Sequence, residues 1–186
     1  MWSPAIKQLS HQIFEELQHL YRDFHRHPEL SFKEKDTSEK IAAYMENLGC
    51  TVQKNVAGTG VVALLMGAKK GPTVAIRADI DALPVEEKSG LPYKSIYEGL
   101  MHACGHDVHI TCALGAAKIL ASLKNDLQGT VKFIFQPAEE INAGAKAMVE
   151  EGVLENPHVS MIFGLHNHPE IPVGKVALKE GPLMAS

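Results

Sequence analysis

Hydrophobic residues recur every three or four positions in two stretches near the start of the chain, which predicts amphipathic helices. The first stretch covers about residues 6–26, and His27-Pro28 ends it because a residue before proline disfavours helical geometry. The second covers about residues 37–48 and closes at Gly49, a typical residue after a helix C-terminus. Two more helices are predicted further along the chain, at about residues 108–123 and 143–151.

Short apolar runs between these helices predict buried strands. They lie at residues 61–66, 73–77, 130–135 and 160–165, and a further strand is expected at 175–179. Strands that alternate with helices are typical of an α/β fold, here with a largely parallel sheet flanked by helices. Ligands of such sheets bind at the carboxyl ends of the strands, so the residues that follow each strand matter most.

Composition and charge exclude several classes of function. The 186 residues are 45% hydrophobic and 22% charged, which is ordinary for a globular protein. A net charge of -4 gives no basic face for nucleic acid or an anionic membrane, so neither is expected as a partner. No apolar run approaches the roughly 20 residues that span a bilayer. The acidic, amphipathic N-terminal stretch does not resemble a secretory signal, which predicts a cytoplasmic location.

Side chains of the types that bind metals stand just past the predicted strands and before one helix. Because the carboxyl ends of parallel strands share one edge of a sheet, we expect four separate segments to meet there. These residues are Asp79 and Asp81, then His102, Cys104, His106, Asp107 and His109 in MHACGHDVH, then Glu139 and Glu140, and finally His166.

The donor types indicate which cations would bind. A thiolate, imidazoles and a carboxylate suit Zn, Mn, Co or Ni better than Ca or Mg. Cys104 and His106 flank a glycine and could face one ion. Glu139 and Glu140 are adjacent, and side chains alternate along an extended segment, so we expect one to bind metal and the other to act as a general base. A pair of ions would hold and acidify a water and polarise a carbonyl.

Each of these residues alone has an ordinary structural explanation. His166 could be a hydrogen-bonded surface histidine, Glu139-Glu140 an acidic helix start, and Cys104 a buried filler. Asp79 and Asp81 could cap a loop. Together these explanations require four coincidences at one sheet edge, so a functional site is favoured. Four histidines outside the cluster are interpreted as surface or structural: His11, His19, His25 and His158.

Several motifs together resemble one known group, the amidohydrolase branch of the metal-dependent aminoacylase and carboxypeptidase superfamily. That branch includes hippurate hydrolases, auxin-conjugate hydrolases and N-acetyl-diaminopimelate deacetylases. The resemblance extends from about His25 to Ser186 and implies a zinc-exopeptidase-like catalytic domain with two divalent ions, Zn, Mn, Co or Ni. The motifs are HRHPELSF, RADIDALP, MHACGHDVH, FQPAEE, GAKAMVEEGVLE, IFGLHNHP and GPLMAS.

The resemblance also implies roles for individual residues. Cys104 corresponds to a thiolate that bridges the metals, and Asp81 to an aspartate that orients the site. Glu139 corresponds to the general base, which deprotonates the metal-bridged water and later protonates the leaving amine. Asp79 and Asp107 would at most support the ligands. The terminal metal ligands would be His106, Glu140 and His166.

The implied reaction is hydrolysis of an N-acyl amino acid, or of a related peptide-like substrate, to a carboxylic acid and an amino acid. Two departures from the family pattern, at Ile141–Gly144 and at Asn167-His168, border the expected pocket and bear on substrate choice. Alternatives are a dipeptidase or carboxypeptidase with the same metal chemistry, or an inactive truncated metal-binding fragment. Members of the branch are about twice as long, so residues 1–186 would be the N-terminal part of the catalytic domain. The lid and dimerisation domain of the homo-oligomeric family form, and a C-terminal catalytic segment, would then be absent.

Overall fold

A computed structural model of the chain describes residues 3–178 and 180–181. The helices are α1 (Ser3–Gln12), α2 (Phe14–Arg26), α3 (Lys35–Asn47), α4 (His106–Ser122) and α5 (Gly144–Glu150). The strands are β1 (Thr51–Val56), β2 (Gly60–Met66), β3 (Lys69–Asp79), β4 (Gln128–Gln136) and β5 (Val159–Gly164). The α/β class predicted from the sequence is confirmed.

The strands form one mixed sheet in the order β1-β2-β4-β3-β5. Strand β3 pairs in parallel with β4 and with β5, whereas the β1-β2 and β2-β4 pairs are antiparallel. The parallel part contains the strands that precede the candidate site. In the antiparallel part, β1, which no apolar run predicted, forms a tight hairpin with β2. Its central residues are polar and exposed, so hydrophobic periodicity did not reveal it.

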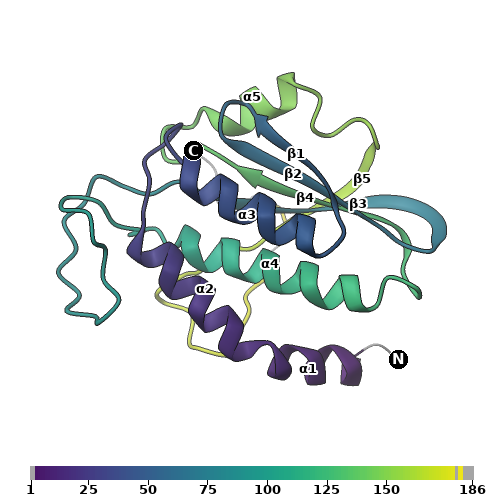
Figure 1. The fold of residues 1–186 in the computed structure, drawn as a ribbon, viewed down its shortest axis with the longest axis horizontal. Helices are drawn as coiled ribbons and strands as arrows, with labels where there is room; N and C mark the ends of the chain where they lie inside the picture. Colours follow the sequence, from purple (N-terminus) through teal and green to yellow (C-terminus); the bar gives the residue numbers. More distant parts are fainter. Residues whose placement is uncertain (1–2, 179, 182–186) are drawn as a thin grey trace.

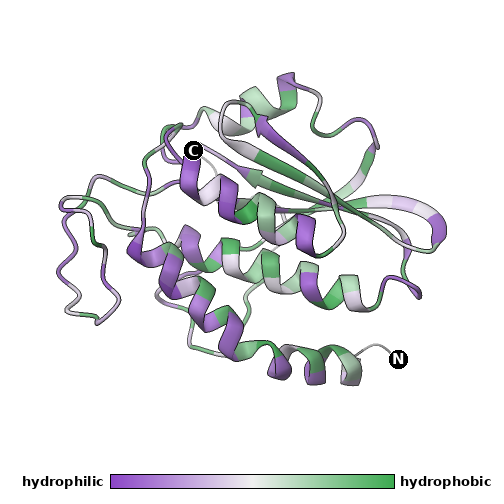
Figure 2. Cartoon of the chain, in the orientation of Figure 1, coloured by the Kyte–Doolittle hydropathy of each residue, from purple (hydrophilic) through white to green (hydrophobic). Residues whose placement is uncertain are grey.

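Helices cover both faces of the sheet unequally (Figure 1). Helix α3 packs against β1 and β2, and α4 packs against β3, while α1 and α2 pack against α4. Helix α5 packs against β4. Strands β2 and β4 contain hydrophobic stretches, whereas β1 is largely polar (Figure 2). Side chains alternate along β4, so Phe133 and Phe135 enter the large core beneath α3 and α4, and Ile134 enters a smaller core beneath α5.

Some local predictions need correction. The long first helix is two helices that meet at Ile13. Residues 175–178 form no strand, and Lys179 lies outside the described residues. Strand β5 is present but largely exposed rather than buried. Within the described part of the chain, none of the helices combines the length and the apolar character needed to cross a membrane.

Candidate metal centre

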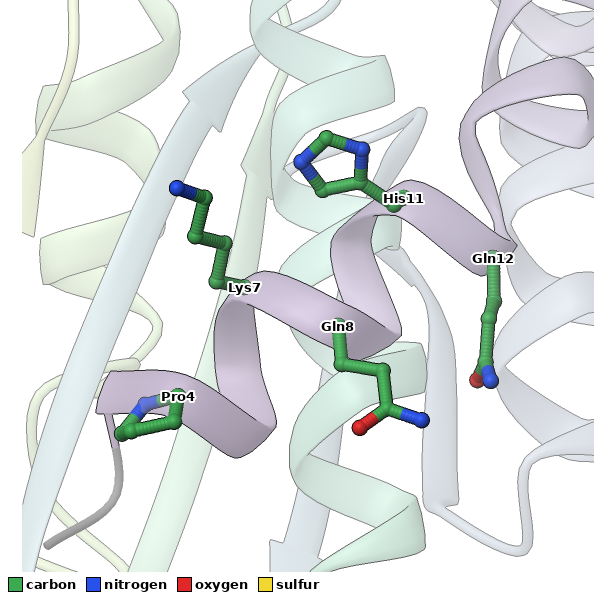
Figure 3. A pocket seen from close by; sticks show the side chains of 5 residues that line it. All are labelled: Pro4, Lys7, Gln8, His11 and Gln12. Carbon is green, nitrogen blue, oxygen red and sulfur yellow. The ribbon is translucent and has the colours of Figure 1, made fainter.

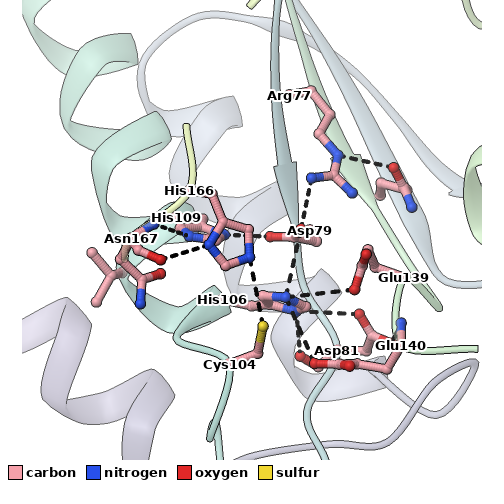
Figure 4. Close-up of polar contacts among 12 residues, drawn as sticks. Arg77, Asp79, Asp81, Cys104, His106, His109, Glu139, Glu140, His166 and Asn167 are labelled. Atoms are coloured by element: carbon pink, nitrogen blue, oxygen red, sulfur yellow. Dashed lines mark hydrogen bonds and ion pairs between the residues drawn. The ribbon is translucent and has the colours of Figure 1, made fainter. Parts of the chain in front are cut away.

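The topology brings the four donor-bearing segments to one edge of the sheet (Figure 4). Asp79 is the last residue of β3 and pairs with Gln136, the last residue of β4. The parallel neighbour β5 ends at Gly164, two residues before His166. His106 begins α4, which packs beneath β3. The expectation that these segments converge is therefore met by the arrangement of the strands.

The side chains with ligand-type atoms lie close enough to surround cations. The Cys104 thiol, His106 and His166 each offer one atom within 4.8 Å of the others, and so do His106, Glu139 and Glu140. The Cys104 Sγ lies 3.6 Å from the His166 Nε2. The His106 Nε2 lies 3.8 Å from both the Glu139 Oε2 and the Glu140 Oε1. His106 is thus shared between two neighbouring groups of donors.

Two atoms of this cluster are buried without any hydrogen-bond partner. They are the His106 Nε2 and the Glu140 Oε1. The His106 Nδ1 donates to the Asp81 carbonyl oxygen at 2.9 Å, which leaves a bare lone pair on Nε2. Buried polar atoms are nearly always satisfied, so unpaired ones call for a specific partner. Because both are lone-pair donors that point toward the same space, a divalent cation fits them.

The turn that carries the two glutamates is held by buried carboxylates. The Ala138 N–H donates to the Glu34 Oε1 at 2.9 Å, and the Glu140 N–H donates to the Asp81 Oδ2 at 3.0 Å. Gly144 closes the turn because a Cβ there would lie 1.6 Å from the Pro137 carbonyl oxygen. The Glu139 side chain remains 37% exposed, whereas that of Glu140 is 16% exposed. The two neighbours therefore differ in access to solvent, as expected if their tasks differ.

On the other side of the cluster, the turn before α4 lies very close to the loop after β5. Gly105 lies between Cys104 and His106 with a φ of 87°. A Cβ at this position would lie 2.4 Å from the Asn167 side-chain nitrogen. Glycine is required here both for the left-handed backbone and for space. The loop after β5 consequently sits directly against the turn that begins α4.

The cluster is electrostatically negative without a cation. Burial raises the pKa of Cys104, and the nearby Glu140 and Glu139 carboxylates raise it further, to about 12. Burial also raises the pKa of Glu140. A thiol surrounded by carboxylates holds its proton, and the same negative field attracts a divalent cation that would replace that proton.

Sequence analysis gave no separate role to His109 or to Arg77. His109 Nδ1 lies 2.6 Å from the Asp79 Oδ1, and Arg77 Nη1 donates to the Asp79 Oδ2 at 2.6 Å. Burial raises the pKa of Asp79, but His109 and Arg77 outweigh it and lower the pKa to about 2. The helical spacing of His106 and His109 places them on one face of α4, and this was the available signal.

Two other histidines near the site are buried. The interpretation of His25 as structural agrees with its contacts, since its ring lies between Asp107 at 2.6 Å and Glu87 at 3.2 Å. His102 is buried with neither ring nitrogen hydrogen-bonded. Burial lowers its pKa to about 4, so the ring is neutral near pH 7. Neither ring belongs to the donor cluster.

Two surface cavities of about 540 Å³ each lie away from the cluster. One runs along α1, where the side chains of Lys7, Gln8 and His11 project from the helix (Figure 3). The other lies beneath residues 92–98 of the loop that follows β3. Neither is lined by a donor residue, so the cluster and not a cavity defines the candidate site.

Comparison with known proteins identifies the family. Residues 75–181 match the sequence model of Peptidase family M20/M25/M40. The chain belongs to this family. The match spans the segments that carry Asp79 through His166, so the resemblance inferred from the motifs is confirmed.

Individual M20 relatives are similar over most of this chain. An N-acetylcysteine deacetylase of Bacillus subtilis is 52% identical over 166 residues, which are 89% of this chain and 43% of the deacetylase. Thermostable carboxypeptidase 1 of Saccharolobus solfataricus is 46% identical over 168 residues, 89% of this chain and 42% of the carboxypeptidase.

A solved M20 structure shares the fold. Bacillus subtilis YxeP, described as a dinuclear metal-binding peptidase, has a TM-score of 0.86 and 49% identity to this chain. The match covers 91% of this chain and 47% of YxeP. The chain thus spans less than half the length of each of these three relatives.

Proposed function

We propose that the protein is a metal-dependent amidohydrolase that cleaves the amide bond of N-acyl amino acids. The observation that carries the proposal is the pair of buried, unpaired donor atoms on His106 and Glu140 within a thiol, imidazole and carboxylate cluster. Membership of the M20 family and similarity to an N-acetylcysteine deacetylase support the same chemistry. The products are a carboxylic acid and a free amino acid.

Four residues would hold two divalent cations. Cys104 would be one of these residues, because its Sγ lies 3.6 Å from the His166 Nε2 and belongs to one group of donors with His106 and His166 (Figure 4). His106, Glu140 and His166 would complete the set. The mixture of thiolate, imidazole and carboxylate favours Zn, Mn, Co or Ni. Bound there, the cations supply Lewis acidity that polarises a carbonyl and acidifies water.

Glu139 would move the proton of the reaction. Its partly exposed carboxylate takes a proton from water as the oxygen attacks the amide carbon, and then gives that proton to the nitrogen as the C–N bond breaks. Asp81 would act as a positioning residue, since its carbonyl oxygen accepts from His106 and its side chain accepts from the Glu140 N–H. It thereby fixes two of the four proposed ligands.

A second candidate function differs from the first in its substrate. Similarity to a thermostable carboxypeptidase favours a second candidate, the cleavage of a peptide next to its C-terminal residue. Both reactions use the same attack on an amide carbon and differ in what recognises the ends of the substrate. Residues 1–186 would form the N-terminal part of the catalytic domain, with little turnover by this chain alone.

One set of measurements tests the function. The wild-type chain and Glu139→Gln are compared for Co(II) bound per chain and for hydrolysis of N-acetyl-methionine, hippurate and dipeptides. We expect both proteins to bind Co(II) alike, and any hydrolysis by the wild type to fall about 10²-fold or more in the variant. Faster cleavage of dipeptides than of acyl amino acids favours the second candidate. A wild-type chain that binds no Co(II), or a variant with undiminished hydrolysis, contradicts the proposed roles.

A further inference from the structure

His166 stands on the least supported part of the candidate metal centre. Strand β5 is the last strand of the sheet and pairs only with β3 among the described residues. Every residue from 160 to 170 is exposed. Burial therefore does little to fix the position of the His166 ring, and specific contacts have to do so.

Few polar contacts join the loop that carries His166, residues 165–178, to the rest of the described chain. The Asn167 N–H donates to the His109 Nε2 at 3.1 Å. The Cys104 Sγ contact with the His166 Nε2, at 3.6 Å, joins two donor side chains of the site itself. The other hydrogen bonds described for this loop are internal to it. His109 is thus the main polar anchor of the loop outside the candidate ligands.

The anchor itself is rigid. His109 and Asp79 are both almost fully buried, and the His109 Nδ1 donates to the Asp79 Oδ1 at 2.6 Å. Arg77 donates from Nη1 to the Asp79 Oδ2 at 2.6 Å and from Nε to the Gln136 Oε1 at 2.9 Å. This chain of contacts fastens the His109 ring to β3 and β4. With its proton on Nδ1, His109 presents a bare Nε2 to the Asn167 N–H.

The backbone of Asn167 connects this anchor to the His166 ring, because its N–H donates to His109 and its carbonyl oxygen accepts from His166. The His166 Nδ1 donates to the Asn167 carbonyl oxygen at 2.7 Å, which leaves the Nε2 free to face Cys104. Figure 4 shows the order of these groups, from Arg77 through Asp79 and His109 to Asn167 and His166. Holding the Asn167 backbone therefore also holds the ring that would bind metal.

We infer that His109 is a positioning residue that anchors the Asn167 backbone and thereby aims His166 at the metal centre. The anchoring stands on the hydrogen bonds alone, and only its consequence for metal binding rests on the proposed function. The same geometry argues against His109 as a ligand, although Asp79, His106 and His109 lie close together. Both ring nitrogens of His109 and both carboxylate oxygens of Asp79 already have partners.

Two near-isosteric variants separate the two bonds of His109. In His109→Asn the amide nitrogen takes the place of Nδ1 and keeps the bond to Asp79 but loses the acceptor for Asn167. In His109→Gln the amide oxygen reaches the place of Nε2 and keeps that acceptor. The pair thus compares loss of the proposed anchor with its retention in a similarly polar side chain.

Amide hydrogen exchange in the metal-free chain is the primary measurement. We expect His109→Asn to raise exchange of the Asn167 amide about tenfold or more, and His109→Gln to raise it by less than about threefold. Equal protection of Asn167 in His109→Asn and in the wild type overturns the inference, as does equal loss in both variants. Because no metal is present, this result is independent of whether the protein is a hydrolase.

Co(II) bound per chain is the second measurement. We expect His109→Asn to lower the stoichiometry toward that of His166→Ala, and His109→Gln to keep the wild-type value. If the wild type binds Co(II) and His109→Asn matches it, the link to His166 is wrong. If the wild type binds none, the proposed function fails while the exchange result still decides the anchor. Should His109→Asn not fold, Asn167→Pro removes the same N–H. Exchange at Ile171, whose N–H donates to the His168 carbonyl oxygen, then replaces exchange at Asn167, and unchanged protection there counts against the anchor.

Discussion

Strands β4 and β5 flank β3 on opposite sides, run parallel to it and lead into the same site, yet their surroundings differ. Strand β4 lies between two other strands, and its Phe133 and Phe135 are fully buried. Strand β5 lies at the edge, and its Met161 and Phe163 are each 55% exposed. The glutamates after β4 thus extend from the core, whereas His166 follows an uncovered strand.

The contrast between β4 and β5 indicates that one site can be assembled from segments of unequal rigidity. The turn after β4 is fixed by backbone N–H groups that donate to the buried carboxylates of Glu34 and Asp81, and these bonds position Glu139 and Glu140. The segment after β5 depends on the bond between Asn167 and His109. Substitutions in the turn after β4 should change both the stability of the fold and the function. Substitutions in the segment after β5 should change the function alone.

The largest contrast is expected in metal binding. His106 contributes to both groups of donors, so His106→Ala should lower Co(II) affinity by about 10²-fold or more and affect every bound ion. His166→Ala removes a donor from one group and should leave one ion bound. Titration followed by Co(II) absorption distinguishes the two outcomes. An equal loss of Co(II) binding in both variants would show that the segments after β4 and β5 do not contribute to separate ions.

Core packing should give the next largest contrast. Phe133→Ala removes a fully buried ring from β4 and should lower the free energy of unfolding by about 3–5 kcal/mol. Phe163→Ala, on β5, removes a ring that is 55% exposed and should cost less than about 1 kcal/mol. Urea denaturation followed by circular dichroism measures both. A β5 variant as destabilised as the β4 variant would indicate that β5 is covered in solution.

Lys132 links the two strands and offers a smaller effect. Its buried Nζ donates to the carbonyl oxygens of Val153, Glu155 and Pro157 at 2.8, 2.8 and 2.9 Å, just before β5. Lys132→Met leaves these acceptors without that partner and should cost about 2–3 kcal/mol. Lys146→Met, at an exposed position on α5, is the matched control and should stay within about 0.5 kcal/mol. Similar unfolding midpoints for both variants would refute the link.

The smallest predicted effect concerns pH. The hydrogen bond with Asp107 raises the pKa of His25, and the Glu87 contact adds to this while burial opposes it. A raised folded-state pKa means that the stabilisation is fully present below the unfolded pKa of about 6.5 and is lost as pH rises through the folded value. His25→Gln should therefore flatten the decline in unfolding free energy above about pH 6.5. A decline of unchanged size in the variant would place its origin elsewhere.

The position of the site was predictable from sequence because it depends on local order along the chain. Apolar runs marked the strands that end at Asp79 and Gln136, and the donors follow those runs directly. The topological rule for strand ends then sufficed to bring Cys104, His106 and Glu140 together. No knowledge of side-chain contacts was required for that step.

The contacts that hold the candidate ligands in position could not be predicted in the same way. His109 and Asn167 are 58 positions apart in the sequence, and no local sequence pattern indicates that they are in contact. Strand β1 was not predicted because its exposed polar residues lack an alternating apolar face. The apolar run at 160–165 wrongly predicted burial, because its place at the sheet edge leaves the strand exposed.

The exposed edge of β5 has a consequence for association between copies of this 186-residue chain. Residues 159–165 contain no charged residue and no proline, the devices that usually keep edge strands from pairing with other molecules. Among the described residues no strand pairs with the outer side of β5, and such an unpaired edge beside the exposed Met161 and Phe163 is a template for intermolecular strand addition. Association through this edge, more than unfolding, should limit the solubility of the chain, and Ile162→Lys should raise that solubility.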